Sequence, residues 1–179
     1  MNKLLNKIKL WAFPENQYYP QVTRKKQIVL HHTVSGEGVK GDINWWKQTK
    51  QRIATHFIID REGNIHQLFN SNYWGHHLGV KDKKYNNTKL NKQSIGIELD
   101  SWGPLKEFNN KMYPVKRENN KYVPNTDLDP ILNYMVYPNK YRGFEYYESY
   151  TNKQIESLKE LLIYFNQKKF FPYSFLTVL

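Results

Sequence analysis

Two adjacent histidines stand where an apolar segment of the chain ends. The run QIVLHH (residues 27–32) closes with His31 and His32. Imidazole can ligate a metal ion or move a proton near neutral pH, so such a pair at a strand end is a candidate for either task. The pair lacks the spacing of a zinc motif, so a second interpretation stays open: one histidine packs in the core and the other lies in a solvated loop.

A carboxylate interrupts a second apolar segment, SIGIEL (residues 94–99). Strand alternation puts Ile95 and Ile97 on one face, and Ser94, Gly96 and Glu98 on the other. If this second face is buried, the pKa of Glu98 rises toward the range of a general base. If the face meets water, Glu98 is a surface carboxylate.

A third candidate is the segment YWGHHLG (residues 73–79). Its glycines frame Trp74, His76 and His77, which offer a stacking face and N–H donors to a sugar or a peptide. The alternative is that Trp74 anchors the loop to the core. His56 and His66 lie within apolar segments, and we expect both to be structural.

Several elements must position these groups. Residues 27–32 and 94–99 are rich in β-formers and predict strands, and the segments 55–60 and 64–69 flank a glycine-containing turn and predict a hairpin. Asp42 is a plausible N-cap for a helix reaching Arg52. Thr151 and Gln154 form a capping-box pattern. The helix that follows is expected to bury one apolar face, formed by Ile155, Leu158, Leu161, Leu162 and Phe165.

This order of elements predicts an α/β fold with a single mixed central β-sheet flanked by helices. The length of 179 residues suits one domain, residues 1–179. Residues 101–150 lose clear periodicity, and we interpret them as an insertion.

Composition narrows the function. The chain has 27 Lys and Arg against 16 Asp and Glu, a net charge of +11, which favours an anionic partner such as a cell-wall polymer, a nucleic acid or a membrane surface. The lysines are dispersed, which argues against specific nucleic-acid binding. There is no cysteine, so a metal site would need histidine and carboxylate ligands. Residues 1–13 lack the apolar core of a secretory signal, and no run is long enough to span a bilayer.

Taken together, five segments resemble the zinc-dependent N-acetylmuramoyl-L-alanine amidases of the amidase-2 family, which includes the peptidoglycan recognition proteins and phage amidases. They occur in this order: LHHT (30–33), THFIIDREGNIHQLF (55–69), YWGHHLG (73–79), NKQSIGIEL (91–99) and YTNKQIESLKELL (150–162).

The resemblance implies roles for individual residues. It implies that His31 is a zinc ligand, that Glu98 is the catalytic base, and that His77 lines the substrate cleft with Trp74 and His76 beside it. It implies a zinc cofactor, and a peptidoglycan or muropeptide substrate cut at the amide between the muramic acid lactyl group and L-alanine. Other members carry a tyrosine where this chain has Thr55.

The chain departs from the family pattern at its end. Relatives place a second zinc histidine and a third ligand beyond the last helix, whereas this chain has no histidine after His77 and ends in FFPYSFLTVL (170–179). We therefore expect a truncated or diverged amidase, with a non-catalytic peptidoglycan-binding module as the alternative. Among family relatives, synthesis in the cytoplasm without a signal peptide suits either a phage endolysin, which acts at the cell wall after release, or a cytosolic wall-recycling enzyme. The basic charge favours the endolysin, and we expect a monomer.

Overall fold

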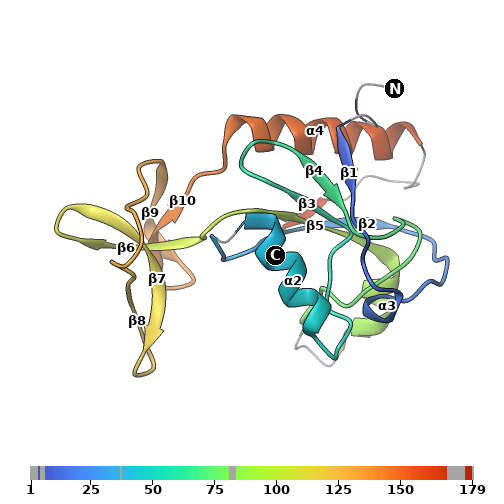
Figure 1. The fold of residues 1–179 in the computed structure, drawn as a ribbon, viewed down its shortest axis with the longest axis horizontal. Coiled ribbons are helices and arrows are strands. Elements are labelled where there is room, and N and C mark those ends of the chain that lie inside the picture. The colour runs from blue at the N-terminus through green and yellow to red at the C-terminus, as the bar shows by residue number, and fades with distance from the viewer. Residues whose placement is uncertain (1–3, 5–6, 37, 81–83, 169–175, 179) are drawn as a thin grey trace.

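The computed structural model describes residues 4, 7–36, 38–80, 84–168 and 176–178. Figure 1 shows two β-sheets that lie side by side along the long axis of the molecule, with the helices around the larger one. None of the described helices is long and apolar enough to cross a membrane.

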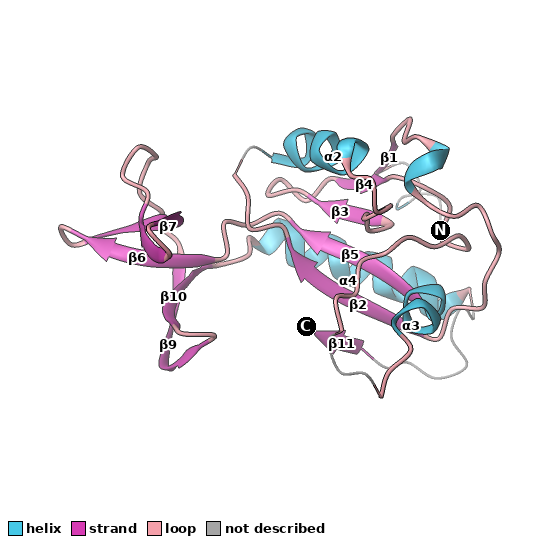
Figure 2. Ribbon diagram, turned by 90° about the horizontal axis from the view of Figure 1, so that it is seen from below, coloured by secondary structure: helices cyan, strands magenta, loops and turns pink. Residues whose placement is uncertain are grey.

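The larger sheet is mixed, as the sequence predicts. Its strand order is β1-β4-β3-β5-β2-β11, with β3 and β4 antiparallel and the other neighbours parallel. The strands are β1 (Ile8–Leu10), β2 (Gln27–His32), β3 (Phe57–Ile59), β4 (Ile65–Gln67), β5 (Ser94–Leu99) and β11 (Leu176–Val178). Figure 2 shows β2 and β5 next to each other, with β11 at the outer edge.

The predicted strands and hairpin are confirmed. β2 and β5 coincide with the apolar runs 27–32 and 94–99, and β3 and β4 form the hairpin. Its turn contains Gly63, at a φ of +80°. A Cβ there would lie 2.6 Å from the carbonyl oxygen of Lys153, so only glycine allows this turn to approach the neighbouring helix.

Helices cover both faces of the larger sheet, with α4 (Asn152–Gln167) on one side and α2 (Gly38–Gln48) on the other (Figure 1). The structure also contains two short helices, η1 (Glu15–Gln17) and α3 (Asn87–Gln93). The α4 side holds an apolar cluster that includes Ile28, Leu30, Ile95, Ile97, Leu158, Leu161 and Phe165. The α2 side holds a second cluster that includes Ile43, Trp46 and Ile58. Alternate residues of β3 therefore enter two separate cores, Phe57 and Ile59 on the α4 side and Ile58 on the α2 side.

Two predictions about helices are wrong in detail. Asp42 lies inside α2 and not at its N-cap, because the helix already begins at Gly38, and the helix ends at Gln48, before Arg52. Asp42 Oδ1 instead accepts a hydrogen bond of 2.6 Å from Ser35 Oγ.

In α4 the Thr151–Gln154 capping box is confirmed, but Ile155 is 44% exposed. Gln154 takes the buried position, because its side-chain amide donates to the carbonyl oxygens of Ile59 and Asp100 at the ends of two strands.

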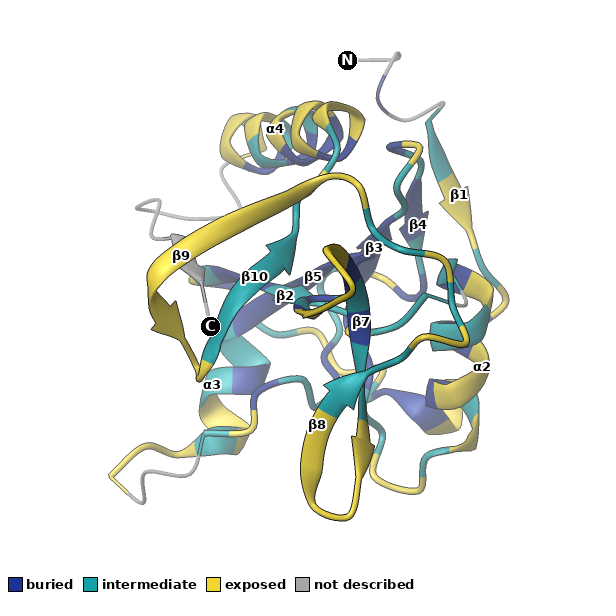
Figure 3. Cartoon of the chain, turned by 90° about the vertical axis from the view of Figure 1, so that its left-hand side faces the viewer, coloured by how far each residue is buried: buried dark blue, intermediate teal, exposed yellow. Residues whose placement is uncertain are grey.

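The predicted insertion folds as a second, antiparallel sheet of order β8-β7-β6-β10-β9. Its strands are β6 (Pro104–Phe108), β7 (Lys111–Glu118), β8 (Lys121–Pro124), β9 (Tyr134–Tyr141) and β10 (Phe144–Glu148). Three hairpins have two-residue turns with positive φ at both positions: 109–110, 119–120 and 142–143. The sequence pattern does not reveal this sheet, because strands such as β9 are exposed along their whole length (Figure 3) and show no alternation.

Arg61 joins the two sheets. It lies in the β3–β4 turn and donates to Asp100, just after β5, at 2.8 Å, and through two nitrogens to Glu148, at the end of β10, at 3.0 Å each. Asp100 and Glu148 are 3% and 11% exposed, so these carboxylates depend on this cation for compensation.

We expect the Arg61→Met variant to lose roughly 2–4 kcal/mol of unfolding free energy, because it leaves two poorly solvated carboxylates without their partner. Lys7→Met is the matched control. Lys7 pairs with Glu160 at 2.8 Å, but both side chains are more than a third exposed, so its loss should stay below about 1 kcal/mol. Urea denaturation measures both values, and equal losses would contradict the role given to Arg61.

Candidate active site

The pairing of β2 with β5 brings the two leading candidates together. His31 stands opposite Glu98 in the parallel register. Both side chains line a cavity of about 460 Å³ with His77 from the segment 73–79. The described residues around this cavity are His31, His32, Val34, His77, Gly79, Val80, Glu98 and Arg142.

The imidazoles of this cavity are neutral at pH 7. Burial, and next the charge of His32, lower the pKa of His31 to about 4. Burial, and next the charge of His31, hold the pKa of His77 well below its ordinary value. Each ring therefore carries one N–H donor and one acceptor nitrogen.

Hydrogen bonds fix which nitrogen carries the proton. The Ser94 hydroxyl donates to the Leu90 carbonyl oxygen at 2.8 Å, so its oxygen accepts from His77 Nε2 at 2.9 Å. His77 Nδ1 is then the acceptor for His31 Nε2, 3.0 Å away. Both nitrogens of His77 are thus engaged within the protein, and the unprotonated nitrogen of His31 is Nδ1.

The sequence left open whether the Glu98 side chain is buried or meets water. In the structure it is buried, since Glu98 is only 9% exposed. Burial, and next the charge of Asp42, raise the pKa of Glu98 to about 8. Among the described residues, Glu98 Oε2 has no hydrogen-bond partner. The same side chain lines a second cavity, of about 440 Å³, with Thr33, Ser35, Gly41, Asp42, Trp45 and Trp46. Glu98 therefore stands between two adjoining hollows with an oxygen available to a ligand.

Trp74 and His76 are not among the described residues that line either cavity. Trp74 is 5% exposed and stacks on Tyr19 with ring centroids 3.9 Å apart. His76 packs edge-on against the same tyrosine, and Arg52 and Lys92 cover the outer faces of the stack. This placement matches the anchoring interpretation of Trp74, and a binding role for Trp74 and His76 stays a prediction.

His56 is structural, as predicted. Its Nδ1 accepts from the Gly96 amide at 3.1 Å and its Nε2 bonds the Tyr73 carbonyl oxygen at 2.9 Å. His66 is satisfied in the same way, since its Nδ1 accepts from Trp11 Nε1 and its Nε2 contacts Asp60. Neither ring has a nitrogen available for a ligand.

Lys25 is a supporting residue that the sequence analysis did not single out. It is 2% exposed, and its ammonium donates to the carbonyl oxygens of Tyr73 and Lys92 at 2.5 and 3.2 Å. Burial lowers the pKa of Lys25 to about 7. The side chain ties the segment that carries His77 to the end of α3. Its position between Arg24 and Lys26 gives no signal of burial, since three consecutive cations usually form a solvated surface.

The donor set of the described residues does not fit the zinc ion that the resemblance implies. A catalytic zinc needs three protein ligands. No group of three His, Asp or Glu side chains converges as a metal site within the described part of the chain. His77 has no nitrogen to spare, which leaves His31 Nδ1 as the one imidazole lone pair of the His31–His77 pair.

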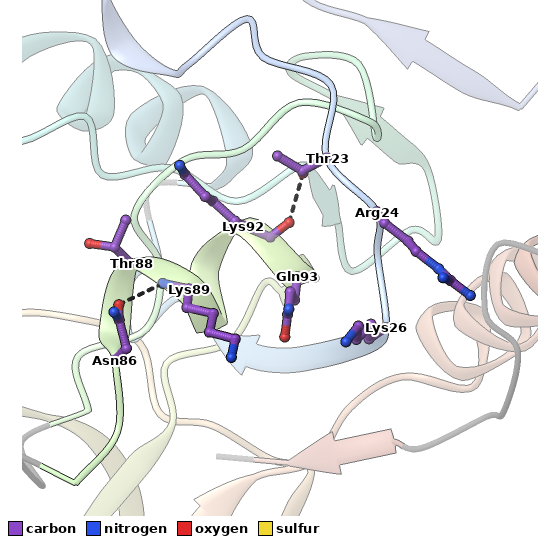
Figure 4. A pocket seen from close by; sticks show the side chains of 8 residues that line it. All are labelled: Thr23, Arg24, Lys26, Asn86, Thr88, Lys89, Lys92 and Gln93. Atoms are coloured by element: carbon purple, nitrogen blue, oxygen red, sulfur yellow. Dashed lines mark hydrogen bonds between the residues drawn. The ribbon is translucent and has the colours of Figure 1, made fainter.

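A separate cavity of about 580 Å³ lies beside α3 and carries a different chemistry (Figure 4). It is lined by Thr23, Arg24, Lys26, Asn86, Thr88, Lys89, Lys92 and Gln93. None of these side chains is a carboxylate or an imidazole, and four of them are the cations Arg24, Lys26, Lys89 and Lys92. We therefore take the cavity that contains His31 and Glu98 as the candidate site.

Comparison with known proteins identifies the family of the chain. The sequence profile of the amidase-2 family, described as N-acetylmuramoyl-L-alanine amidase, matches residues 21–173. The chain belongs to this amidase family. The matched range includes both strands that carry His31 and Glu98, the second sheet and α4. No curated protein sequence matches the chain.

Solved structures show the same fold. The endolysin LysCS from Clostridium intestinale, an N-acetylmuramoyl-L-alanine amidase, superposes with a TM-score of 0.52 at 18% identity, over 94% of this chain and 79% of that one. The peptidoglycan recognition protein SA of Drosophila superposes with a TM-score of 0.54 at 15% identity, over 96% of this chain and 79% of that one. The predicted α/β architecture of the amidase family is therefore confirmed.

The raised pKa of Glu98 makes stability depend on pH. Its folded pKa, about 8, exceeds the ordinary 4.5, so between these values the folded state holds a proton that the unfolded state has released. The native protein therefore loses stability from this group as pH rises from 5 to 8. The Glu98→Gln variant lacks this pH-dependent contribution. The unfolding free energy of the variant minus that of the wild type should therefore increase by roughly 2–4 kcal/mol from pH 5 to pH 8.

Denaturation of both proteins at pH 5 and pH 8 measures this difference. Glu62→Gln, at an exposed position in the β3–β4 turn, is the control and should show no such growth. A constant difference for Glu98→Gln would show that Glu98 is solvated.

Proposed function

We propose that the chain hydrolyses the amide between the lactyl group of N-acetylmuramic acid and L-alanine in peptidoglycan. The observation that carries the proposal is the buried Glu98 carboxyl, which stands beside His31 and lines the same cavity. The amidase family membership supports the bond that is cut.

In this proposal Glu98 moves the proton. As a carboxylate it takes a proton from a water molecule that attacks the lactyl carbonyl carbon, and it then delivers that proton to the leaving nitrogen of L-alanine as the C–N bond breaks. His31 Nδ1 is the acceptor that can hold the attacking water in place. With a pKa of about 8, about a tenth of Glu98 is in the basic form at pH 7, so hydrolysis should increase toward pH 9.

A second function competes with this one. In this second function the chain binds muramoyl peptides without cutting them. The observation that favours it is the engagement of both His77 nitrogens, which keeps this imidazole from serving as a metal ligand. In family members zinc polarises the scissile carbonyl, and the described residues of this chain do not supply that group with three ligands.

We propose that the chain acts at the bacterial cell wall with either function, as an endolysin does. The net charge of +11 attracts the protein to the anionic polymers of the wall, and this attraction weakens with salt because it is electrostatic.

Replacing Glu98 by Gln should reduce hydrolysis at least about 100-fold while leaving peptidoglycan binding within about twofold, because the amide keeps the shape of the group but cannot take the proton. The measurement is release of peptides with a free L-alanine amino terminus from purified peptidoglycan, together with sedimentation of the protein with the same material. Glu62→Gln should behave as wild type. Undiminished release by Glu98→Gln would remove Glu98 as the base.

Chelation separates the two functions. Dialysis against a strong chelator should leave peptidoglycan binding unchanged within about twofold, since the cavity is built from side chains that hydrogen-bond one another and not from a metal cluster. A wild-type chain that binds peptidoglycan but releases no peptide, even after zinc is added back, would establish the binding function and exclude the hydrolytic one. Loss of binding on chelation would show that a metal organises the cavity.

A further inference from the structure

One cation reaches the Glu98 cavity from the second sheet. Arg142 lies in the turn between β9 and β10, and it lines the cavity beside His32, Val34 and Gly79. Its charge is the second cause, after burial, of the lowered pKa of His32, which places the guanidinium close to the end of β2. The second sheet therefore contributes a wall to the site built by the first.

The turn itself does not account for an arginine at this position. Arg142 has a φ of +50° and is followed by Gly143 at +88°. The other two hairpin turns of this sheet use asparagine pairs, the residue type that adopts positive φ most readily after glycine. An arginine there costs some backbone strain, and such strain at a cavity wall indicates a role for the side chain.

Arg142 is an exposed residue, and its charge is not paired with an acidic side chain of the described residues. No ion pair joins its guanidinium to an acidic side chain of the described residues, and its recorded contact is the ring of Tyr141, 5.5 Å from the guanidinium carbon. Glu98, the one acid among the described lining residues, forms no ion pair with Arg142. Among the described lining residues, this cation thus has no paired anion.

The hairpin that carries Arg142 is fixed from within and at its base. Tyr147 donates from its hydroxyl to the Tyr141 carbonyl oxygen at 2.6 Å, and its ring packs against Tyr137 and Tyr141. At the base, Glu148 takes two hydrogen bonds from Arg61. These contacts hold the backbone of the hairpin, and the guanidinium of Arg142 itself lies over the Tyr141 ring.

We propose that Arg142 binds a free carboxylate of the stem peptide and thereby selects muramoyl peptides that carry one. This inference rests on the proposed function, since it assumes that a muramoyl peptide occupies the cavity. Guanidinium and carboxylate match in planar geometry and form paired charge-assisted hydrogen bonds. In this arrangement Glu98 and His31 face the amide, and the β9–β10 hairpin holds the peptide that leaves.

The test compares two ligands in the Glu98→Gln background, which is designed to prevent turnover. One is N-acetylmuramoyl-L-alanyl-D-isoglutamine, which has a free γ-carboxylate, and the other is its γ-amide. Calorimetry should show tighter binding of the acid, and Arg142→Gln should weaken binding of the acid by about 10- to 100-fold while leaving the amide unchanged. Arg142→Lys should restore part of the preference.

Arg117→Gln is the matched control. Arg117 is an exposed residue on β7 of the same sheet. Its replacement by Gln changes the net charge by the same amount, so binding of the acid should equal that of the parent Glu98→Gln protein. Equal binding of acid and amide, or an Arg142→Gln variant that keeps the preference, would overturn the role of Arg142 and leave the proposed function standing. Failure of both ligands to bind would overturn both the role of Arg142 and the proposed function.

Discussion

The site depends on one constraint, the parallel register of β2 and β5. His31 and Glu98 are neighbours because Ile28 pairs with Ile95 and Leu30 with Ile97. Those four aliphatic side chains enter the core beneath α4, and burying them favours this register by several kcal/mol. A slip of one residue would turn either His31 or Glu98 into that apolar core. The hydrophobic free energy on one face of the sheet therefore determines where the acid–base groups stand on the other.

Local pattern was sufficient for much of the fold. The apolar runs at 27–32 and 94–99, the glycine turn at 61–63 and the Thr151 capping box each act over a few residues, and each is present as predicted. Alternation also placed Glu98 on the face opposite Ile95 and Ile97. The prediction that Ile155 is buried failed because Gln154 reaches two strand-end carbonyl groups. Sequence periodicity carries no information about such a tertiary contact.

The second sheet and its contribution to the site could not be predicted in the same way. Two of its turns carry Asn-Asn pairs, which are hairpin signals, but exposed strands such as β9 lack the alternation that would confirm them. Asp42 and Arg142 approach Glu98 and His32 across more than 50 residues of sequence. Such neighbours follow from the packing of whole elements, and no local pattern identifies them.

The histidines show how a shared fold can differ in its chemistry. His31 stands at the strand end where the family resemblance implies a zinc ligand, but its Nε2 bonds His77, and His77 in turn bonds Ser94. This hydrogen-bonded chain satisfies buried imidazoles that would otherwise lose hydration without compensation. Within the described residues, these hydrogen bonds hold the His31 and His77 side chains in the cavity.

The central claim is that the cavity shared by His31 and Glu98 is where peptidoglycan binds. A crystal structure of the Glu98→Gln protein with a bound muramoyl dipeptide tests it directly. The account predicts the lactyl amide within hydrogen-bond distance of residue 98. A ligand bound instead in the basic hollow beside α3, with the cavity of His31 and residue 98 containing only water, would contradict it.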